Sequence, residues 1–128
     1  MRFARILFLI AGIYGLVALV PQYFLEERNN LTFPPPITHP EYYYGFVGLG
    51  VVWQVLFLVL SRDPVRYRPM MIPAVLEKAS FGLAVVVLVM QHRTPAMMLA
   101  PATIDLILGL LFAVAYVKTA HASEGFGK

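Results

Sequence analysis

Four long runs of apolar residues, separated by short polar segments, dominate the pattern along this chain. The runs cover residues 6–24, 44–60, 70–90 and 96–117. A helix needs about 20 mainly apolar residues to cross the hydrocarbon core of a bilayer, and lipid offers no partner to an unpaired backbone amide. The pattern therefore predicts an all-α integral membrane protein, a four-helix transmembrane bundle that forms one membrane domain over residues 1–128.

The composition of the chain supports a membrane protein. Hydrophobic residues make up 59% of it and charged residues 13%, whereas soluble domains carry about 25% charged residues. The chain has no cysteine, which excludes a disulfide framework, thiol catalysis and a cysteine-ligated iron–sulfur cluster. The first run follows Arg2 and Arg5, as in a secretory signal, but no small-residue cleavage site comes after it. We therefore expect a retained span.

The distribution of lysine and arginine predicts the orientation of the bundle. One side of the predicted membrane holds Arg2, Arg5, Arg62, Arg66, Arg68, Lys118 and Lys128. The other side holds only Arg28 and Arg93. Because cytoplasmic loops are enriched in these residues, both termini are expected in the cytoplasm and the loop at 25–43 outside, in a bacterial inner membrane. The basic residues at the membrane edges account for the net charge of +3, so no nucleic-acid partner is expected.

Polar residues inside the predicted spans are the candidate functional residues. Glu77, Lys78 and Asp105 are ionisable, and such groups are costly within a membrane. At 1.5 Å per residue, Glu77 lies about 10 Å from the inner surface and Asp105 about 12 Å from the outer one. Gln54 and Tyr14 add polar groups near the middle of their spans. Gln54, Glu77, Asp105 and Tyr14 are therefore the candidate ligand-binding residues.

A structural role would also account for the two charges at the start of the third span. The long side chain of Lys78 is expected to reach back to the cytoplasmic surface. Glu77 is shorter and is expected to pair with one of the arginines on that surface, Arg62, Arg66 or Arg68, or with Lys78 folded back towards it. The pair would then fix the third helix to the inner loop.

Asp105 lies on a face of small residues. Helical spacing places it with Ala102, Gly109 and Ala113, and small residues allow membrane helices to pack closely. Asp105 is therefore expected to face other helices rather than lipid. In the structural alternative to ligand binding, it forms a buried hydrogen bond with Gln54 or Tyr14 that holds the helices together.

The segment "RDPVRYRP" joins the second and third spans. It places Arg62, Arg66, Arg68 and Tyr67 at the depth of anionic lipid headgroups, which attract each basic residue by about 1 kcal/mol. These four residues are the candidate headgroup or partner contacts. The alternative is an anchor that serves only the orientation of the protein. On the opposite side, a loop with three consecutive prolines precedes Tyr42, Tyr43 and Tyr44, an aromatic group typical of a membrane boundary.

The chain shows no catalytic constellation, phosphate loop or metal-ligand cluster, so we expect a non-catalytic protein without a metal. A haem in a helical bundle would need axial histidines within the spans, but His39, His92 and His121 lie in loops or at edges. Haem is therefore not expected, and contact with a quinone or a pigment stays open.

The arrangement resembles DoxX-like membrane proteins. The resemblance covers the whole bundle and includes a polar residue, Gln54, before "LFLVL" in the second span, the arginine turn from Arg62 to Arg68, and an interior acid, Asp105. Many members of that family carry an acid where this chain has Gln54. Some members are small subunits of quinone-linked oxidoreductases, so the resemblance implies an accessory or quinone-side role.

Three functional hypotheses follow. The first is a non-catalytic subunit of a larger respiratory or photosynthetic membrane complex, which contacts lipids and other membrane subunits through its small-residue faces, outer loop and arginine turn. A neighbouring subunit would also hold the polar tail at 121–128, which would otherwise fray. The second is a DoxX-like protein that binds a quinone, a lipid or another small hydrophobic molecule within the bundle. The third is a small transporter.

Overall fold

The structure, a computed structural model, describes residues 1–124, with side chains up to His121. Within this range four helices are long and apolar enough to cross a membrane: Arg2–Phe24, Pro40–Arg62, Arg68–Met90 and Ala96–His121. The predicted all-α architecture with four membrane-length helices is therefore confirmed. Lys128 and the second half of the polar tail lie outside the described residues.

Each helix extends beyond the apolar run that predicted it. Helix α1 (Arg2–Leu19) continues into the 3-10 helix η1 (Val20–Phe24). Helix α3 spans Pro40–Arg62. The short helices η2 (Arg68–Met70) and η3 (Ala96–Met98) lead into α4 (Met71–Met90) and α5 (Leu99–Glu124). Backbone hydrogen bonding continues through the polar ends of the spans, and Pro40 suits the first turn of α3 because that turn needs no amide donor from it.

The segment at 25–43, expected as a connecting loop, contains a further helix, α2 (Glu26–Thr32). Two acidic residues, Glu26 and Glu27, occupy its first turn, where negative charge is favourable at the positive end of the helix dipole. After α2, the amide of Ile37 donates a 2.7 Å hydrogen bond to Asn30 Oδ1. The outer segment therefore contains a helix and a side-chain hydrogen bond where the sequence predicted only a connecting loop.

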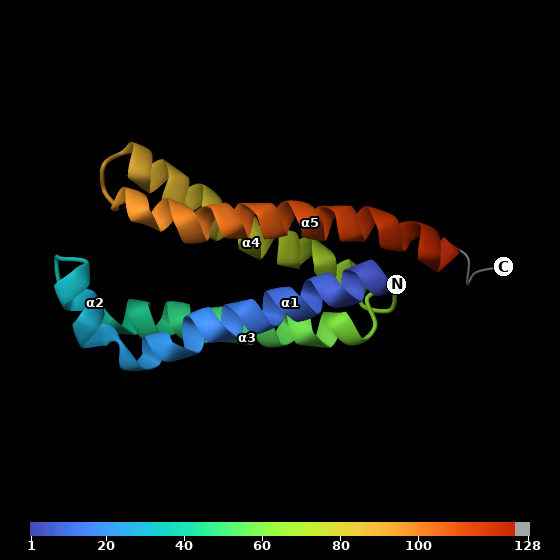
Figure 1. Cartoon of the computed structure of the whole chain (residues 1–128), viewed down its shortest axis with the longest axis horizontal. Helices are drawn as coiled ribbons and strands as arrows, with labels where there is room; N and C mark the ends of the chain where they lie inside the picture. Colours follow the sequence, from blue (N-terminus) through green and yellow to red (C-terminus); the bar gives the residue numbers. More distant parts are fainter. Residues whose placement is uncertain (125–128) are drawn as a thin grey trace.

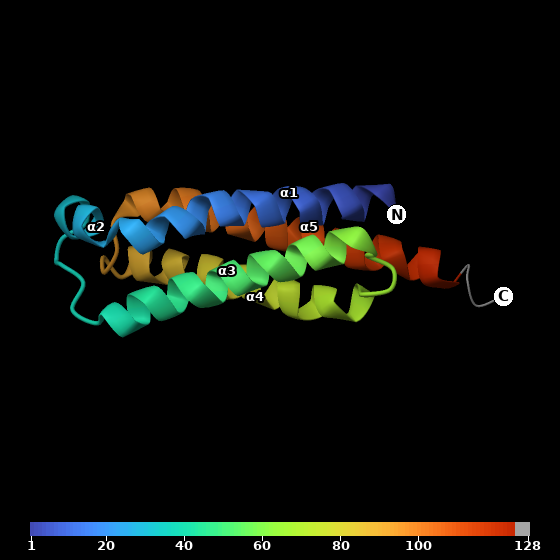
Figure 2. The ribbon, with the colours of Figure 1, turned by 90° about the horizontal axis from the view of Figure 1, so that it is seen from below.

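The four long helices form two pairs, α1 with α3 and α4 with α5. The pairs meet at the end of the molecule where the N-terminus lies and diverge towards α2 (Figure 1). In Figure 2, turned by 90°, one pair is seen in front of the other. We name these the terminus end and the α2 end. Close packing within α4–α5 depends on Gly82, because a Cβ there would lie 2.6 Å from Leu106 Cγ.

The small-residue face of α5 is used inside the chain. Ala102 is fully buried, and a Cβ on Gly109 would lie 3.2 Å from the Cβ of Lys78 in α4. Asp105 therefore faces a neighbouring helix, as predicted. The expectation that this face contacts another subunit is wrong for Ala102 and Gly109, because α4 already covers them.

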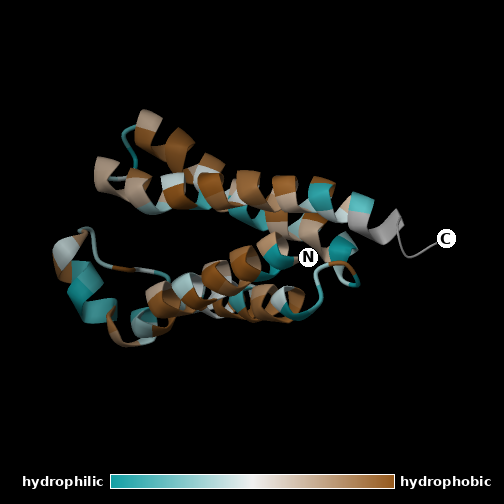
Figure 3. Cartoon of the chain, turned by 45° about the vertical axis from the view of Figure 1, so that its right-hand side comes forward, coloured by the Kyte–Doolittle hydropathy of each residue, from teal (hydrophilic) through white to brown (hydrophobic). Residues whose placement is uncertain are grey.

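An aromatic layer closes the terminus end. Phe8 of α1, Phe57 of α3 and Phe112 of α5 are all fully buried. The rings of Phe8 and Phe112 stack at 4.4 Å, and Phe57 meets Phe112 edge-on at 5.1 Å. Many large hydrophobic residues of the long helices are exposed on the outside of the molecule, and Figure 3 shows hydrophilic segments mainly at the ends and connections of these helices. Such an exterior suits a lipid environment.

Candidate ligand-binding cavity

A cavity of about 620 Å³ lies between the two helix pairs. All four long helices, η1, α2 and the α4–α5 connection contribute to its lining. Its walls are mainly apolar, with side chains such as Leu19, Phe46, Val47, Phe81 and Met98. The cavity therefore occupies the space that opens as the pairs diverge above the aromatic layer.

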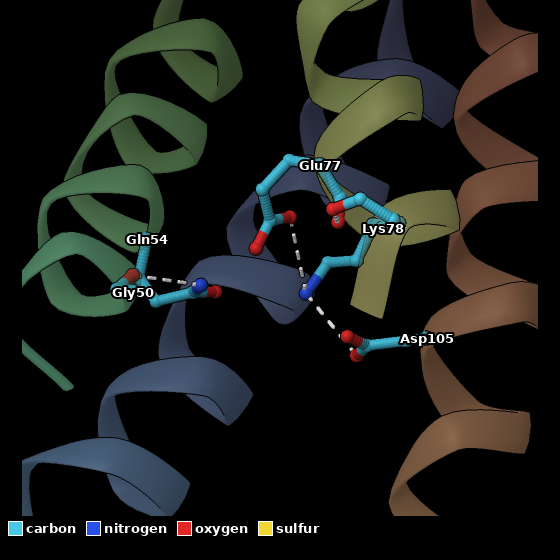
Figure 4. A network of polar contacts seen from close by, with 6 residues as sticks. Gly50, Gln54, Glu77, Lys78 and Asp105 are labelled. Carbon is cyan, nitrogen blue, oxygen red and sulfur yellow. Dashed lines mark hydrogen bonds and ion pairs between the residues drawn. The ribbon is translucent and has the colours of Figure 1, made fainter. Parts of the chain in front are cut away.

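The polar residues predicted from the sequence all line this one cavity. Tyr14 comes from α1, Gln54 from α3, Glu77 from α4 and Asp105 from α5. Figure 4 shows Gln54, Glu77 and Asp105 directed towards a common centre, with Lys78 between the two acids. Lys78 was not among the ligand-binding residues predicted from the sequence, although its position beside Glu77 in an apolar helix was a signal for it.

Lys78 is buried, with only 3% of its surface exposed. Its Nζ donates a hydrogen bond to Asp105 Oδ1 at 3.3 Å, lies 3.8 Å from Glu77 Oε2, and sits 5.2 Å from the centre of the Phe57 ring. The prediction that Lys78 reaches the membrane surface is wrong, because Asp105 on the adjacent helix supplies a half-buried acidic partner. We name Glu77, Lys78 and Asp105 the charged triad.

The expectation that Glu77 pairs with an arginine near the terminus end is wrong. The ion-pair partner of Glu77 is Lys78, the other option considered. Glu77 lies nine helical steps after Arg68, which corresponds to about 13 Å along a helix, and the buried residues Met71 and Ala74 lie in that interval. The distance along α4 thus separates the acid from the surface arginines.

Gln54 has its amide fixed in one orientation. Only 1% of the residue is exposed, and Nε2 donates a 3.0 Å hydrogen bond to the carbonyl of Gly50. Since that carbonyl can only accept, the amide nitrogen must face it. Gln54 Oε1 receives no hydrogen bond from the described residues. The expected bond between Asp105 and Gln54 or Tyr14 is replaced by the bond from Lys78 to Asp105.

The glycine at position 15 makes this arrangement of Gln54 possible. A Cβ on Gly15 would overlap the side-chain amide of Gln54, so only glycine leaves room for the amide between α1 and α3. The close approach of these two helices thus holds Gln54 beside the charged triad.

A hydrogen-bonded group ties α2 to α3 at the mouth of the cavity. The hydroxyl of Tyr43 donates to the carbonyl of Gln22 at 2.6 Å, and Asn29 Nδ2 donates to both Tyr43 Oη and Gln22 Oε1 at 2.9 Å. Nearby, the Tyr44 hydroxyl donates to Glu26 at 2.6 Å. Two of the three consecutive tyrosines therefore brace the α2 end.

The arginine turn has two different parts. Arg68 Nε donates to the Tyr116 carbonyl at 3.0 Å, and its guanidinium lies 3.7 Å from the centre of that ring. This contact fastens the α3–α4 connection to α5. Arg62 and Tyr67 instead line a smaller cavity of about 430 Å³, together with Asp63 and apolar residues of α3. The backbone amide of Arg66 donates to Asp63. A headgroup or partner contact at this turn stays a prediction.

Comparison of the chain with known protein families, with curated proteins and with solved structures finds no match to any of them. The resemblance to DoxX-like proteins therefore stays a prediction, and the cavity is the feature that points to a function.

Proposed function

We propose that this protein binds a small, mainly apolar molecule within its four-helix bundle, in a bacterial inner membrane. The observation that carries the proposal is the convergence of polar side chains from four different helices on one cavity of about 620 Å³. Small-molecule sites have volumes of about 300–1,000 Å³, apolar walls and a few polar groups that fix orientation. The cavity has these properties.

The charge pattern supports an orientation for the site. With both termini in the cytoplasm, the aromatic layer faces the inner side and the α2 end faces outward. The molecule would then enter from the outer side or the outer leaflet and place its polar end on the charged triad. The resemblance to DoxX-like proteins favours a quinone or a lipid as the class of molecule.

A subunit role in a respiratory or photosynthetic complex is the second candidate. The feature that favours it is the exposure of Phe24, Leu31 and Tyr42 in the outer segment, an apolar surface that a membrane partner could cover. Both roles are compatible, because a subunit can also hold a molecule in its bundle. A small transporter would further require a state in which the aromatic layer opens, and flux across vesicles tests that role.

Filling the cavity should abolish binding. The Ala18→Trp substitution adds a large ring to the cavity lining and is expected to remove any small molecule that co-purifies with the wild-type protein. The adjacent Val17 is 70% exposed and does not line the cavity, so Val17→Trp is the matched control and should retain the molecule. Native mass spectrometry from a gentle detergent measures both. Equal retention by the two variants would count against the proposal.

A further inference from the structure

We infer that the charged triad and Gln54 bind the protonated amine end of an amphiphilic molecule. This inference rests on the proposed function and specifies the chemical class of the ligand. It follows from the charge balance of the triad, from two buried acceptor atoms and from the aromatic residues beside them.

The triad contains two acidic side chains and one basic side chain. When ionised, the carboxylates of Glu77 and Asp105 contribute two negative charges and Lys78 contributes one positive charge, which leaves one negative charge in the interior of the bundle. An uncompensated charge is costly in a membrane. A ligand with a single positive charge would make the site neutral, whereas a carboxylate would double the excess.

The geometry assigns the excess charge to Glu77. Lys78 Nζ donates its hydrogen bond to Asp105 at 3.3 Å, and its distance to Glu77 Oε2 is 3.8 Å. Glu77 Oε2 is buried and receives no hydrogen bond from the described residues. Lys78 and Asp105 therefore form the better-matched pair, and Glu77 keeps the free acceptor.

Gln54 supplies a second acceptor that points to the same ligand chemistry. Its Oε1 is also buried without a donor from the described part of the chain, and Gly50 fixes its orientation. An alkylammonium group has three N–H donors and no acceptor, so its chemistry matches a site that offers acceptors and no free donor. An alcohol has a single donor, and a carboxylate or a ketone has none.

Aromatic residues line the cavity next to these acceptors. Phe81 lies one helical turn after Glu77 and so shares its face, and its ring centre is 5.9 Å from that of Phe46. Both residues line the cavity. The face of an aromatic ring attracts a cation within about 6 Å, while the apolar walls receive a hydrocarbon chain. An amine with an alkyl tail therefore matches the whole cavity.

Three probes with the same tail and different ends test this inference. Octylamine, octanol and octanoate are added at neutral pH to the full chain in phosphatidylcholine nanodiscs, and native mass spectrometry measures the bound fraction against empty nanodiscs. Octylamine is expected to bind about 10-fold more tightly than octanol, and octanoate more weakly than both.

Two substitutions test whether Glu77 causes the preference for octylamine. Glu77→Gln keeps the size of the side chain and removes the excess charge, so it should reduce octylamine binding about 10-fold and remove most of the preference for octylamine over octanol. Glu27 is exposed on α2 outside the cavity lining, and Glu27→Gln should leave both unchanged. Because all variants are measured in the same lipid, the partitioning of a given probe into lipid cancels when its binding is compared between variants.

The outcomes separate the inference from the proposed function. If octanol or octanoate binds the wild-type protein as well as octylamine does, the amine preference is wrong while the cavity remains a binding site. If none of the three probes binds the wild-type chain, both the inference and the proposed function fail. The ranking on the wild-type protein decides the inference even if Glu77→Gln does not fold.

Discussion

Replacement of Lys78 by methionine is expected to lower the free energy of unfolding by about 3–5 kcal/mol, the usual cost of removing one partner from a buried ion pair. The substitution leaves the side chains of Glu77 and Asp105, 19% and 15% exposed, without their shared cation. Loss of helical signal during titration with a denaturing detergent measures the effect. The double variant Lys78→Met with Asp105→Asn carries the same net charge as the wild-type triad. Its loss in free energy of unfolding should be smaller than the sum of the losses of the two single variants.

The control for this prediction is Lys118→Met. Lys118 is exposed near the terminus end and contacts the ring of Phe3 at 4.7 Å, so its removal should cost about 1 kcal/mol or less. If Lys78→Met is as mild as Lys118→Met, Lys78 is not held between two carboxylates and the description of the triad is wrong.

Truncation of Phe57 to alanine is expected to cost about 3–5 kcal/mol, as is typical for a buried aromatic residue. Phe57 is fully buried, contacts the rings of Phe8 and Phe112, and lies beneath the ammonium group of Lys78. The substitution therefore removes both the centre of the aromatic layer and the apolar support of the triad. The same detergent titration measures the loss.

Phe24→Ala is the matched control for Phe57→Ala. Phe24 is 85% exposed, so its truncation removes little packing within the chain and should change the stability by less than about 1 kcal/mol. Equal effects of the two substitutions would show that the aromatic layer does not hold the helix pairs together.

The sequence predicted the fold well because hydropathy reports directly on the membrane. Apolar runs of sufficient length can only be helices in lipid, and all four were found. Helix α2 was missed, since a short polar segment with prolines carries no hydropathy signal, and its stability depends on local features such as the acidic first turn and the bonds from Tyr43 and Tyr44.

The candidate site could be predicted in its members but not in its contacts. The free-energy cost of polar side chains in lipid and the helical spacing indicated that Gln54, Glu77 and Asp105 face the interior. The sequence did not show that α4 pairs with α5 closely enough for Lys78 to reach Asp105. That contact depends on the small residues between the two helices, which had been interpreted as a surface for another subunit.

The role of Lys78 shows the limit of an argument from one helix at a time. If α4 is considered alone, the ammonium group of Lys78 can avoid the lipid only by extending to the membrane surface. With α5 beside it, Asp105 offers an anion at 3.3 Å, and a buried pair replaces the extended side chain. Tertiary packing therefore determines that Lys78 pairs with Asp105 inside the bundle and that Glu77 pairs with Lys78 rather than with a surface arginine.

The proposed function requires a cavity that opens at the α2 end of the bundle, which faces outward in the proposed orientation, and is closed at the terminus end. Because the natural chain has no cysteine, single cysteines can be placed without background. Ala18 lines the cavity, whereas Ala74 is fully buried beside the aromatic layer. The two substitutions Ala18→Cys and Ala74→Cys are therefore matched in size and differ in their surroundings.

The most direct measurement is the reaction of these two variants with a membrane-impermeant thiol reagent applied from the outer side of intact cells. Ala18→Cys is expected to be labelled from outside, and Ala74→Cys is expected to stay unlabelled from either side. Labelling of Ala18→Cys only after the cytoplasmic side is exposed would reverse the orientation. Failure to label it from both sides would contradict the open cavity on which the proposed function depends.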